Sequence, residues 1–131
     1  MLTGGCHCGA IRYRIMGEVL HHALCHCRDC RRHAGAPMVG WAMLPAEELE
    51  VTGEPVVYAS SEHGRRHFCG RCGTGILYVN EAMLPGLVDI QTGTLDDPEA
   101  LPPGAQIQLA ERLRWMARLD VLPGFERYPP G

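Results

Sequence analysis

The sequence contains no lysine. All 12 basic residues are arginines, and with 15 acidic residues the formal charge is −3 at pH 7. The longest basic runs are the pairs Arg31-Arg32 and Arg65-Arg66. Because electrostatic binding to nucleic acid depends on clustered positive charge, the sequence argues against a nucleic-acid partner.

Long hydrophobic runs are also missing. No apolar stretch approaches the roughly 20 residues that a membrane-spanning helix needs. The N-terminus, MLTGGCHCG, lacks the charged and then apolar segments of a secretion signal. We therefore expect a cytoplasmic protein without a membrane partner. Cysteines are kept reduced in the cytoplasm, which favours metal binding over disulfides as the role of a cysteine cluster.

Cysteine, by contrast, is abundant, and all seven cysteines fall into three clusters. The clusters are Cys6-x-Cys8, Cys25-x-Cys27-x-x-Cys30 and Cys69-x-x-Cys72. An odd number of cysteines cannot pair completely as disulfides. Cysteines one or two residues apart can, however, bind one tetrahedral zinc ion through their thiolates. The simplest division gives the two doublets one four-cysteine site and the triplet a separate three-cysteine site.

The triplet differs from a closed structural site because it offers only three cysteines. Such a site leaves one tetrahedral position for water or a substrate, which is typical of catalytic zinc. Three alternatives stay open at this point. The first is a single zinc ribbon built from two clusters, and the second is an iron–sulfur cluster. The third is that His26, between two cysteines of the triplet, acts as a fourth ligand.

Short strands joined by turns are predicted for most of the chain, because 16 glycines and 10 prolines divide it into short pieces. Residues 11–15 alternate between apolar and polar side chains, as in a half-buried strand. Further strands are expected at 19–24, 38–44, 49–52, 56–59, 65–69, 75–79 and 86–92. Short helical turns are expected at 29–34 and 45–49. No repeat or linker divides the chain, so we expect a single mostly β domain over residues 1–131.

Five stretches resemble the glutathione-dependent formaldehyde-activating family, which includes centromere-protein-V-like proteins. They are GGCHCGAIRY, CHCRDCRRHAGAP, RHFCGRCGTGI, VDIQTGTLDDP, and RLRW followed by LPGFERYPP. The resemblance implies a coiled, tent-like fold of antiparallel sheets held by two zinc ions. It also implies a strand at 106–111, although the residues of 107–119 favour helix. The chain departs from the family at Gln106, where a histidine is common.

The resemblance also implies roles for the cysteines. The structural zinc would be bound by Cys6, Cys8, Cys69 and Cys72. The catalytic zinc would be bound by the triplet Cys25, Cys27 and Cys30, which are therefore the predicted catalytic residues.

Family members named for this activity join glutathione to formaldehyde, formally a carbon–sulfur lyase reaction in reverse. The resemblance thus implies a zinc enzyme acting on adducts of glutathione, or another small thiol, with formaldehyde or a related aldehyde. The chemistry fits, because a metal lowers the pKa of a bound thiol and the thiolate can attack the aldehyde carbon. Two alternatives are a non-catalytic zinc-stabilised binding module and a thiol or metal sensor.

Other residues are weaker candidates for substrate binding. The arginines beside the triplet, Arg28, Arg31 and Arg32, could hold the carboxylates of a peptide thiol, or could form a solvated turn. Trp41 and Trp115 could line a substrate pocket, or could belong to the core.

Overall fold

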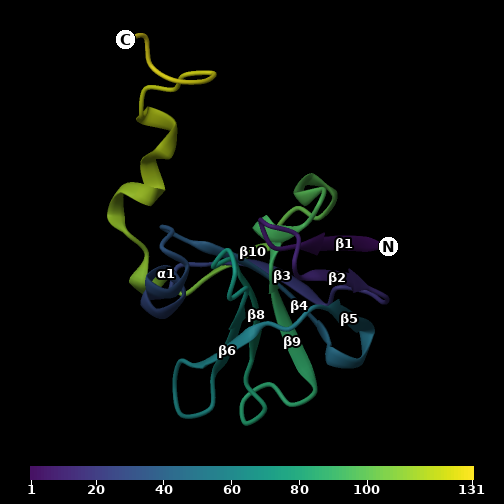
Figure 1. Ribbon diagram of the computed structural model, residues 1–131. Helices are drawn as coiled ribbons and strands as arrows, with labels where there is room; N and C mark the ends of the chain where they lie inside the picture. The colour runs from purple at the N-terminus through teal and green to yellow at the C-terminus, as the bar shows by residue number, and fades with distance from the viewer.

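Strands make up most of the regular structure in the computed structural model, which describes residues 1–131 (Figure 1). In chain order they are β1 (Leu2–Gly5), β2 (Arg12–Ile15), β3 (His21–Cys25), β4 (Val39–Pro45), β5 (Leu49–Thr52), β6 (Val56–Ala59), β7 (Arg65–Phe68), β8 (Gly75–Val79), β9 (Leu87–Gln91) and β10 (Ala105–Ile107). The one α helix is α1 (Arg28–Ala34), and the 3₁₀ helices are η1 (Ala46–Glu48), η2 (Thr92–Thr94), η3 (Pro98–Ala100), η4 (Leu109–Glu111) and η5 (Arg114–Val121). The predicted mostly β class is confirmed.

Nearly all predicted elements are present, within a residue or two at their ends. The exception is the strand predicted at 106–111, which is only partly present, and one strand, β1, was not predicted at all. Its sequence, LTGG, has two glycines and no alternation of apolar and polar residues, so it carries no strand signal of its own. It forms because it pairs antiparallel with β2, from Leu2 opposite Ile15 to Gly5 opposite Arg12.

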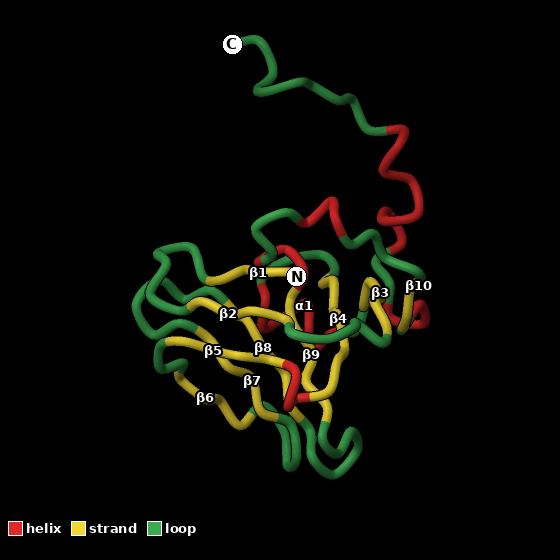
Figure 2. The backbone as a smooth tube through the Cα atoms, turned by 90° about the vertical axis from the view of Figure 1, so that its right-hand side faces the viewer, coloured by secondary structure: helices red, strands yellow, loops and turns green.

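The strands form two sheets (Figure 2). A three-stranded sheet has the order β1-β2-β5, and a seven-stranded sheet has the order β10-β3-β4-β9-β8-β7-β6. Neighbouring strands are antiparallel except β10, which runs parallel to β3 and departs from the antiparallel sheets that were expected. Strands β7 and β8 form the predicted hairpin, with the Cys69–Cys72 turn between them.

The main hydrophobic core lies between the two sheets. Tyr13 and Ile15 of β2 pack with Leu44 of β4, Ile76 of β8 and Ile90 of β9, and none of these side chains is more than 2% exposed. Burying each stabilises the fold by roughly 1.5–3 kcal/mol. One face of the large sheet is therefore committed to the core, and its other face is available for a site.

After β10 the chain leaves the body of the domain. It turns at Gln108, whose φ is +58°, and then forms η4 and η5, with a kink in η5 at Arg118. In Figure 1 this yellow-green segment passes α1 and extends away from the sheets. Residues 107–119 are thus not one continuous helix, and the strand predicted at 106–111 is confirmed only over its first part, in β10. No helix of the structure combines the length and the apolar character needed to cross a membrane.

Candidate metal centres

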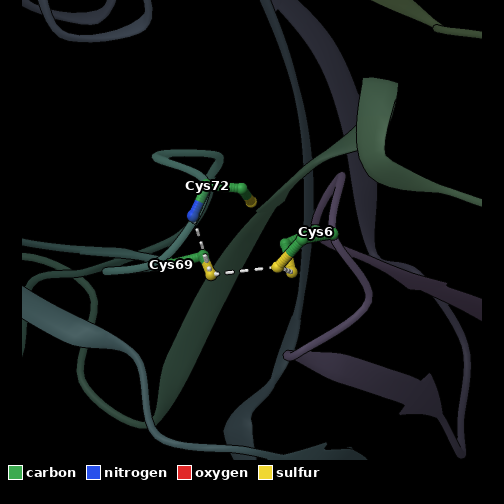
Figure 3. Close-up of side chains that lie close together, drawn as sticks. Cys6, Cys69 and Cys72 are labelled. Atoms are coloured by element: carbon green, nitrogen blue, oxygen red, sulfur yellow. Dashed lines mark hydrogen bonds between the residues drawn. The ribbon is translucent and has the colours of Figure 1, made fainter.

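The four doublet cysteines converge from two turns that are distant in sequence. Cys6 and Cys8 lie between β1 and β2, and Cys69 and Cys72 lie between β7 and β8. Figure 3 shows the side chains of Cys6, Cys69 and Cys72 pointing toward one another. All four sulfur atoms lie within 4.8 Å of one another. The sulfur of Cys8 is 3.7 Å from that of Cys6 and 3.8 Å from that of Cys69. None of the cysteines is in a disulfide.

These distances fit a metal ion held by four thiolates. With zinc–sulfur bonds of about 2.3 Å, the sulfurs of a tetrahedral site lie about 3.8 Å apart. Backbone amides also face the sulfurs: the N–H of Ile11 donates to Cys6 (3.2 Å), and the N–H of Cys72 donates to Cys69 (3.5 Å). Such donors favour the thiolate form that a metal requires. The cluster can therefore hold a metal ion.

Glycine makes both turns possible. Gly9 directly follows Cys8 and Gly73 directly follows Cys72, with φ values of +82° and +83°. Residues with a side chain rarely adopt this left-handed conformation. Beyond the second turn, the Thr74 hydroxyl lies 3.2 Å from the Cys72 sulfur and, as the main cause, lowers the pKa of that thiol to about 5.

The three triplet cysteines form a second, separate cluster, with their sulfurs within 4.8 Å of one another. Cys25 ends β3, and Cys27 is the N-cap of α1, where its sulfur accepts a hydrogen bond from the backbone N–H of Cys30 (3.2 Å). Cys25 and Cys30 are buried, and Cys27 is half-buried. All three line a cavity of about 410 Å³. This cluster can therefore also hold a metal ion, on the wall of a space large enough for a small molecule.

His26 does not belong to the triplet cluster. Its side chain is fully buried, and its Nε2 lies 2.9 Å from Oε1 of Gln106 in the neighbouring strand β10. The structure therefore does not place His26 within the triplet cluster as a fourth ligand. Gln106, where the family commonly has a histidine, has the role of holding this buried imidazole.

The floor of the cavity is the face of the large sheet that points away from the core. Successive side chains of a strand point to opposite faces, so Leu44 and Ile90 enter the core while Met43 and Asp89 enter the cavity. The strand register extends this row across the sheet, with Asp89 opposite Tyr78 and Tyr78 opposite Arg66. Residues opposite one another have Cβ atoms about 4.5–5.5 Å apart. The sheet thus brings an acidic and a basic side chain into one cavity, on either side of a tyrosine.

Arg66 is the basic group of this cavity and was not among the predicted arginines. It is only 5% exposed and forms no ion pair with a carboxylate. Its guanidinium lies 5.0 Å from the ring centre of Tyr78 and 6.0 Å from that of Trp41, and its Nη2 donates to the Cys30 sulfur at 3.8 Å. Hydrogen bonds from Cys25 first, and then from Cys27 and Arg66, lower the pKa of Cys30 to about 5. Arg66 therefore favours thiolate in the triplet.

The predicted arginines lie elsewhere. Arg31 donates to the backbone carbonyls of His26 (3.2 Å) and Glu111 (3.0 Å), and the N–H of Arg28 donates to the Glu111 carboxylate (3.1 Å). These two residues anchor the segment that follows β10. Arg32 lines a second hollow of about 360 Å³, which shares Asp29 and Arg66 with the cavity.

The two tryptophans also differ in position. Trp41 is 7% exposed and lines the cavity, whereas Trp115 is 50% exposed and lies in neither the core nor the cavity. A larger hollow, of about 640 Å³, lies over the small sheet. Its charged side chains already form ion pairs, Arg12 with Asp96 and Arg14 with Glu50, and it contains no cysteine cluster. Of these hollows, only the cavity beside the triplet combines a cysteine cluster with an arginine that has no carboxylate partner.

Asp89 is the acidic group of the cavity and was likewise not predicted. Burial, and secondly the nearby Cys30 thiolate, raises its pKa to about 6. It accepts no hydrogen bond from another side chain of the protein. The available signal was its place in the strand LVDIQ, where a charged residue stands between two buried aliphatic ones.

Replacing Asp89 with asparagine is expected to raise the free energy of unfolding above pH 6.5. The carboxyl titrates near pH 6 in the native protein but near 3.9 in an unfolded chain, so stability is lost as the pH rises from about 4 to 6. Because Asp89 is partly open to solvent, we expect a gain of about 1–2 kcal/mol.

Urea unfolding at pH 5 and pH 7.5 measures this effect. The advantage of Asp89→Asn over the natural chain is expected to be clearly larger at pH 7.5. The exposed substitution Asp97→Asn serves as the control and is expected to change stability little at either pH. An equal gain for Asp89→Asn at both pH values would show that the carboxyl is not penalised by burial.

Comparison with known proteins places this fold and these clusters in a family. The family model described as glutathione-dependent formaldehyde-activating enzyme matches residues 1–111. A protein of Halomonas elongata, provisionally named a glutathione-dependent formaldehyde-activating enzyme, is 30% identical over 118 residues, which are 79% of this chain and 71% of that protein. The crystal structure of a Rhodobacter sphaeroides protein has the same fold, with a TM-score of 0.60 at 22% identity, covering 79% of this chain and 98% of that one.

The chain therefore belongs to the glutathione-dependent formaldehyde-activating enzyme family, and the resemblance seen in the sequence is confirmed. The matched residues contain all three cysteine clusters, Arg66 and Asp89. They end at the root of the segment that leaves the domain.

Proposed function

We propose that this protein is a zinc-dependent carbon–sulfur lyase that acts on the adduct of glutathione, or of another small thiol, with formaldehyde or a related aldehyde. The observation that carries the proposal is the three-cysteine cluster on the wall of a cavity, beside an arginine without a carboxylate partner. Membership of the family supports the choice of thiol and aldehyde.

The two cysteine clusters suit two zinc ions, one structural and one catalytic. Cys6, Cys8, Cys69 and Cys72 would hold a structural ion, and Cys25, Cys27 and Cys30 a catalytic one. No fourth histidine, cysteine or carboxylate joins the triplet. Zinc held there would supply a Lewis-acid position that lowers the pKa of a small thiol and leaves it a nucleophile near neutral pH.

Two cavity residues can transfer the proton of the reaction and stabilise the negative charge that develops during it. When a thiol adds to an aldehyde, a carbon–sulfur bond forms, the carbonyl π bond breaks, and the thiol proton passes to the oxygen. Asp89, ionised above about pH 6, is placed to accept that proton and return it. Arg66 has N–H groups free to stabilise the negative charge that develops on the oxygen. The reverse reaction uses the same groups in the opposite order.

The adjoining hollow suits the remainder of a peptide thiol. Glutathione carries two carboxylates and one ammonium group. Arg32 and Arg66 offer guanidinium groups whose geometry matches carboxylates, and Asp29, on the border of the two spaces, offers a partner for the ammonium. Burial, together with the charge of Arg66, lowers the pKa of His33 in this hollow.

The proposal is tested by exchange NMR of glutathione, formaldehyde and S-hydroxymethylglutathione. The uncatalysed exchange, measured without protein, is the reference. The zinc-loaded protein is expected to accelerate the exchange at concentrations far below those of the substrates. Arg66→Met is expected to reduce the acceleration by tenfold or more while metal content stays unchanged, which corresponds to about 1.4 kcal/mol of transition-state stabilisation.

Three other outcomes would each contradict the proposal. Glutathione binding without acceleration would support the zinc-stabilised binding module instead. Oxidation of the triplet cysteines without any binding of glutathione would support a thiol sensor. Full acceleration by a Cys27→Ser protein would move the reaction away from the triplet altogether.

A further inference from the structure

Exposed apolar side chains are concentrated in the last part of the chain. We call residues 109–131 the C-terminal arm. None of its residues is buried, and seven of the 16 exposed large hydrophobic side chains of the protein lie in it. The most regular are Trp115, Leu119 and Leu122, spaced by three or four residues and 50%, 46% and 56% exposed. The arm therefore exposes large apolar side chains on both sides of its kink at Arg118.

The arm has little to stabilise it within its own chain. Its root is fixed to α1 through Glu111, which is contacted by Arg28 and Arg31. Beyond this point Figures 1 and 2 agree that it extends away from both sheets. Its main element, η5, has eight residues and a kink at Arg118. Isolated helices shorter than about 12–15 residues are marginal in water, so this arrangement needs a surface to pack against.

The solvent-accessible surface of the whole chain is larger than that of a compact monomer of the same mass. A compact monomer of 14.4 kDa is expected to expose about 6,800 Å². This chain exposes 8527 Å², an excess of about 1,700 Å². A specific protein–protein interface needs about 800 Å² from each partner. The excess exposed surface of the chain is thus large enough for one partner's share of a stable interface, and the arm is the part of the chain that extends away from the sheets.

We propose that the arm packs against a second copy of this chain, so that the protein is a homodimer with exchanged arms. Two further observations select a second copy. The arm carries four arginines and three acidic residues, a formal charge of +1, which leaves −4 on residues 1–108 of the partner. The arm also begins next to β10, an edge strand that pairs only with β3 and whose three residues are all exposed.

The exposed edge strand β10 explains how two chains can form a closed dimer rather than an open chain of molecules. Two identical edges related by a twofold axis can face each other, and each can then pass its arm to the other domain. The result is a closed dimer, in which the same patch serves on both copies. The inference does not depend on the proposed lyase activity, since no arm residue belongs to either cysteine cluster.

The test is the molar mass of the purified zinc-loaded protein, measured by light scattering after size-exclusion chromatography. At tens of micromolar, the natural chain is expected to have twice the mass of the 14.4 kDa chain. The variant Leu119→Asp/Leu122→Asp is expected to have the mass of a single chain and an unchanged circular dichroism signal from the strands. The control Arg114→Gln/Asp120→Asn changes polar residues of the same arm and is expected to remain a dimer.

Tryptophan fluorescence gives a second, independent reading. The chain has two tryptophans, so in a Trp41→Phe background the emission reports only on Trp115 in the arm. Emission is expected to move to shorter wavelength as protein concentration rises through the dimer equilibrium. A natural chain that is monomeric at 100 µM or above, or a dimer that persists in Leu119→Asp/Leu122→Asp, would overturn the proposal. Short-wavelength emission that is independent of concentration in a monomer would place the arm on its own domain instead.

Discussion

Substituting serine for Cys69 is expected to abolish cooperative folding at 25 °C. Cys69 is 1% exposed, and its sulfur contacts the first doublet and the amides of its own turn. Structural zinc contributes on the order of 10–16 kcal/mol in small zinc domains, whereas whole domains are stable by only about 5–15 kcal/mol. Weakening the four-thiolate site therefore threatens the entire native state.

Far-UV circular dichroism, thermal unfolding and zinc content of the soluble fraction measure this loss. The expected result is a low yield of soluble protein without a cooperative transition. Cys27→Ser is the matched control, because it removes one thiolate from the other cluster and is expected to keep the fold. A soluble Cys69→Ser protein with a normal thermal transition would show that the doublets do not form a structural metal site.

The second large effect is expected when metal is removed gradually. Mild chelation should extract one zinc ion, leave the circular dichroism spectrum unchanged and abolish binding of glutathione. The triplet ligands come from one segment of six residues, Cys27 is half-buried, and the cluster faces a cavity. The four-cysteine cluster instead joins the turns of two different sheets through the buried residues Cys6 and Cys69, so we expect its metal to be removed only together with the fold.

A chelator titration with three readouts tests this asymmetry: zinc content, circular dichroism, and glutathione binding by native mass spectrometry. Cys27→Ser is expected to reproduce the chelated state, with one zinc, a native spectrum and no bound glutathione. Simultaneous loss of both ions and of the fold would show that the triplet is structural. If glutathione still binds after the first ion has left, thiol binding does not require the metal held by the triplet.

Cysteine positions could be grouped from the sequence because ligand spacing is a local property. Residues two or three positions apart, such as Cys6 and Cys8 or Cys69 and Cys72, lie within about 7–10 Å of each other in any fold. The structure brings the two doublets together and keeps the triplet apart, as predicted from the number of ligands that a tetrahedral ion takes. The hairpin at Cys69–Cys72 was also predictable, since glycines mark its turn between two apolar runs.

Features that depend on pairing between distant strands could not be predicted in this way. Arg66 and Asp89 share a cavity only because both lie opposite Tyr78 in the register of the large sheet. Within the pair Arg65-Arg66, the sequence does not say which side chain faces inward. The orientation of His26 likewise depends on Gln106, 80 residues away, and on a parallel pairing that no local pattern encodes.

The span of the four-cysteine cluster has a consequence for how the protein is made. Cys8 and Cys69 are 61 residues apart, and at about 5–20 residues per second a ribosome needs roughly 3–12 s to extend the chain from one to the other. Closing a loop of this length costs about 4 kcal/mol of chain entropy, which metal capture must offset. During that interval the first doublet has only two of the four cysteines of its cluster. The four-cysteine site therefore cannot form before residue 72 has been made, and a chain that stops before Cys69 would lack half of its ligands.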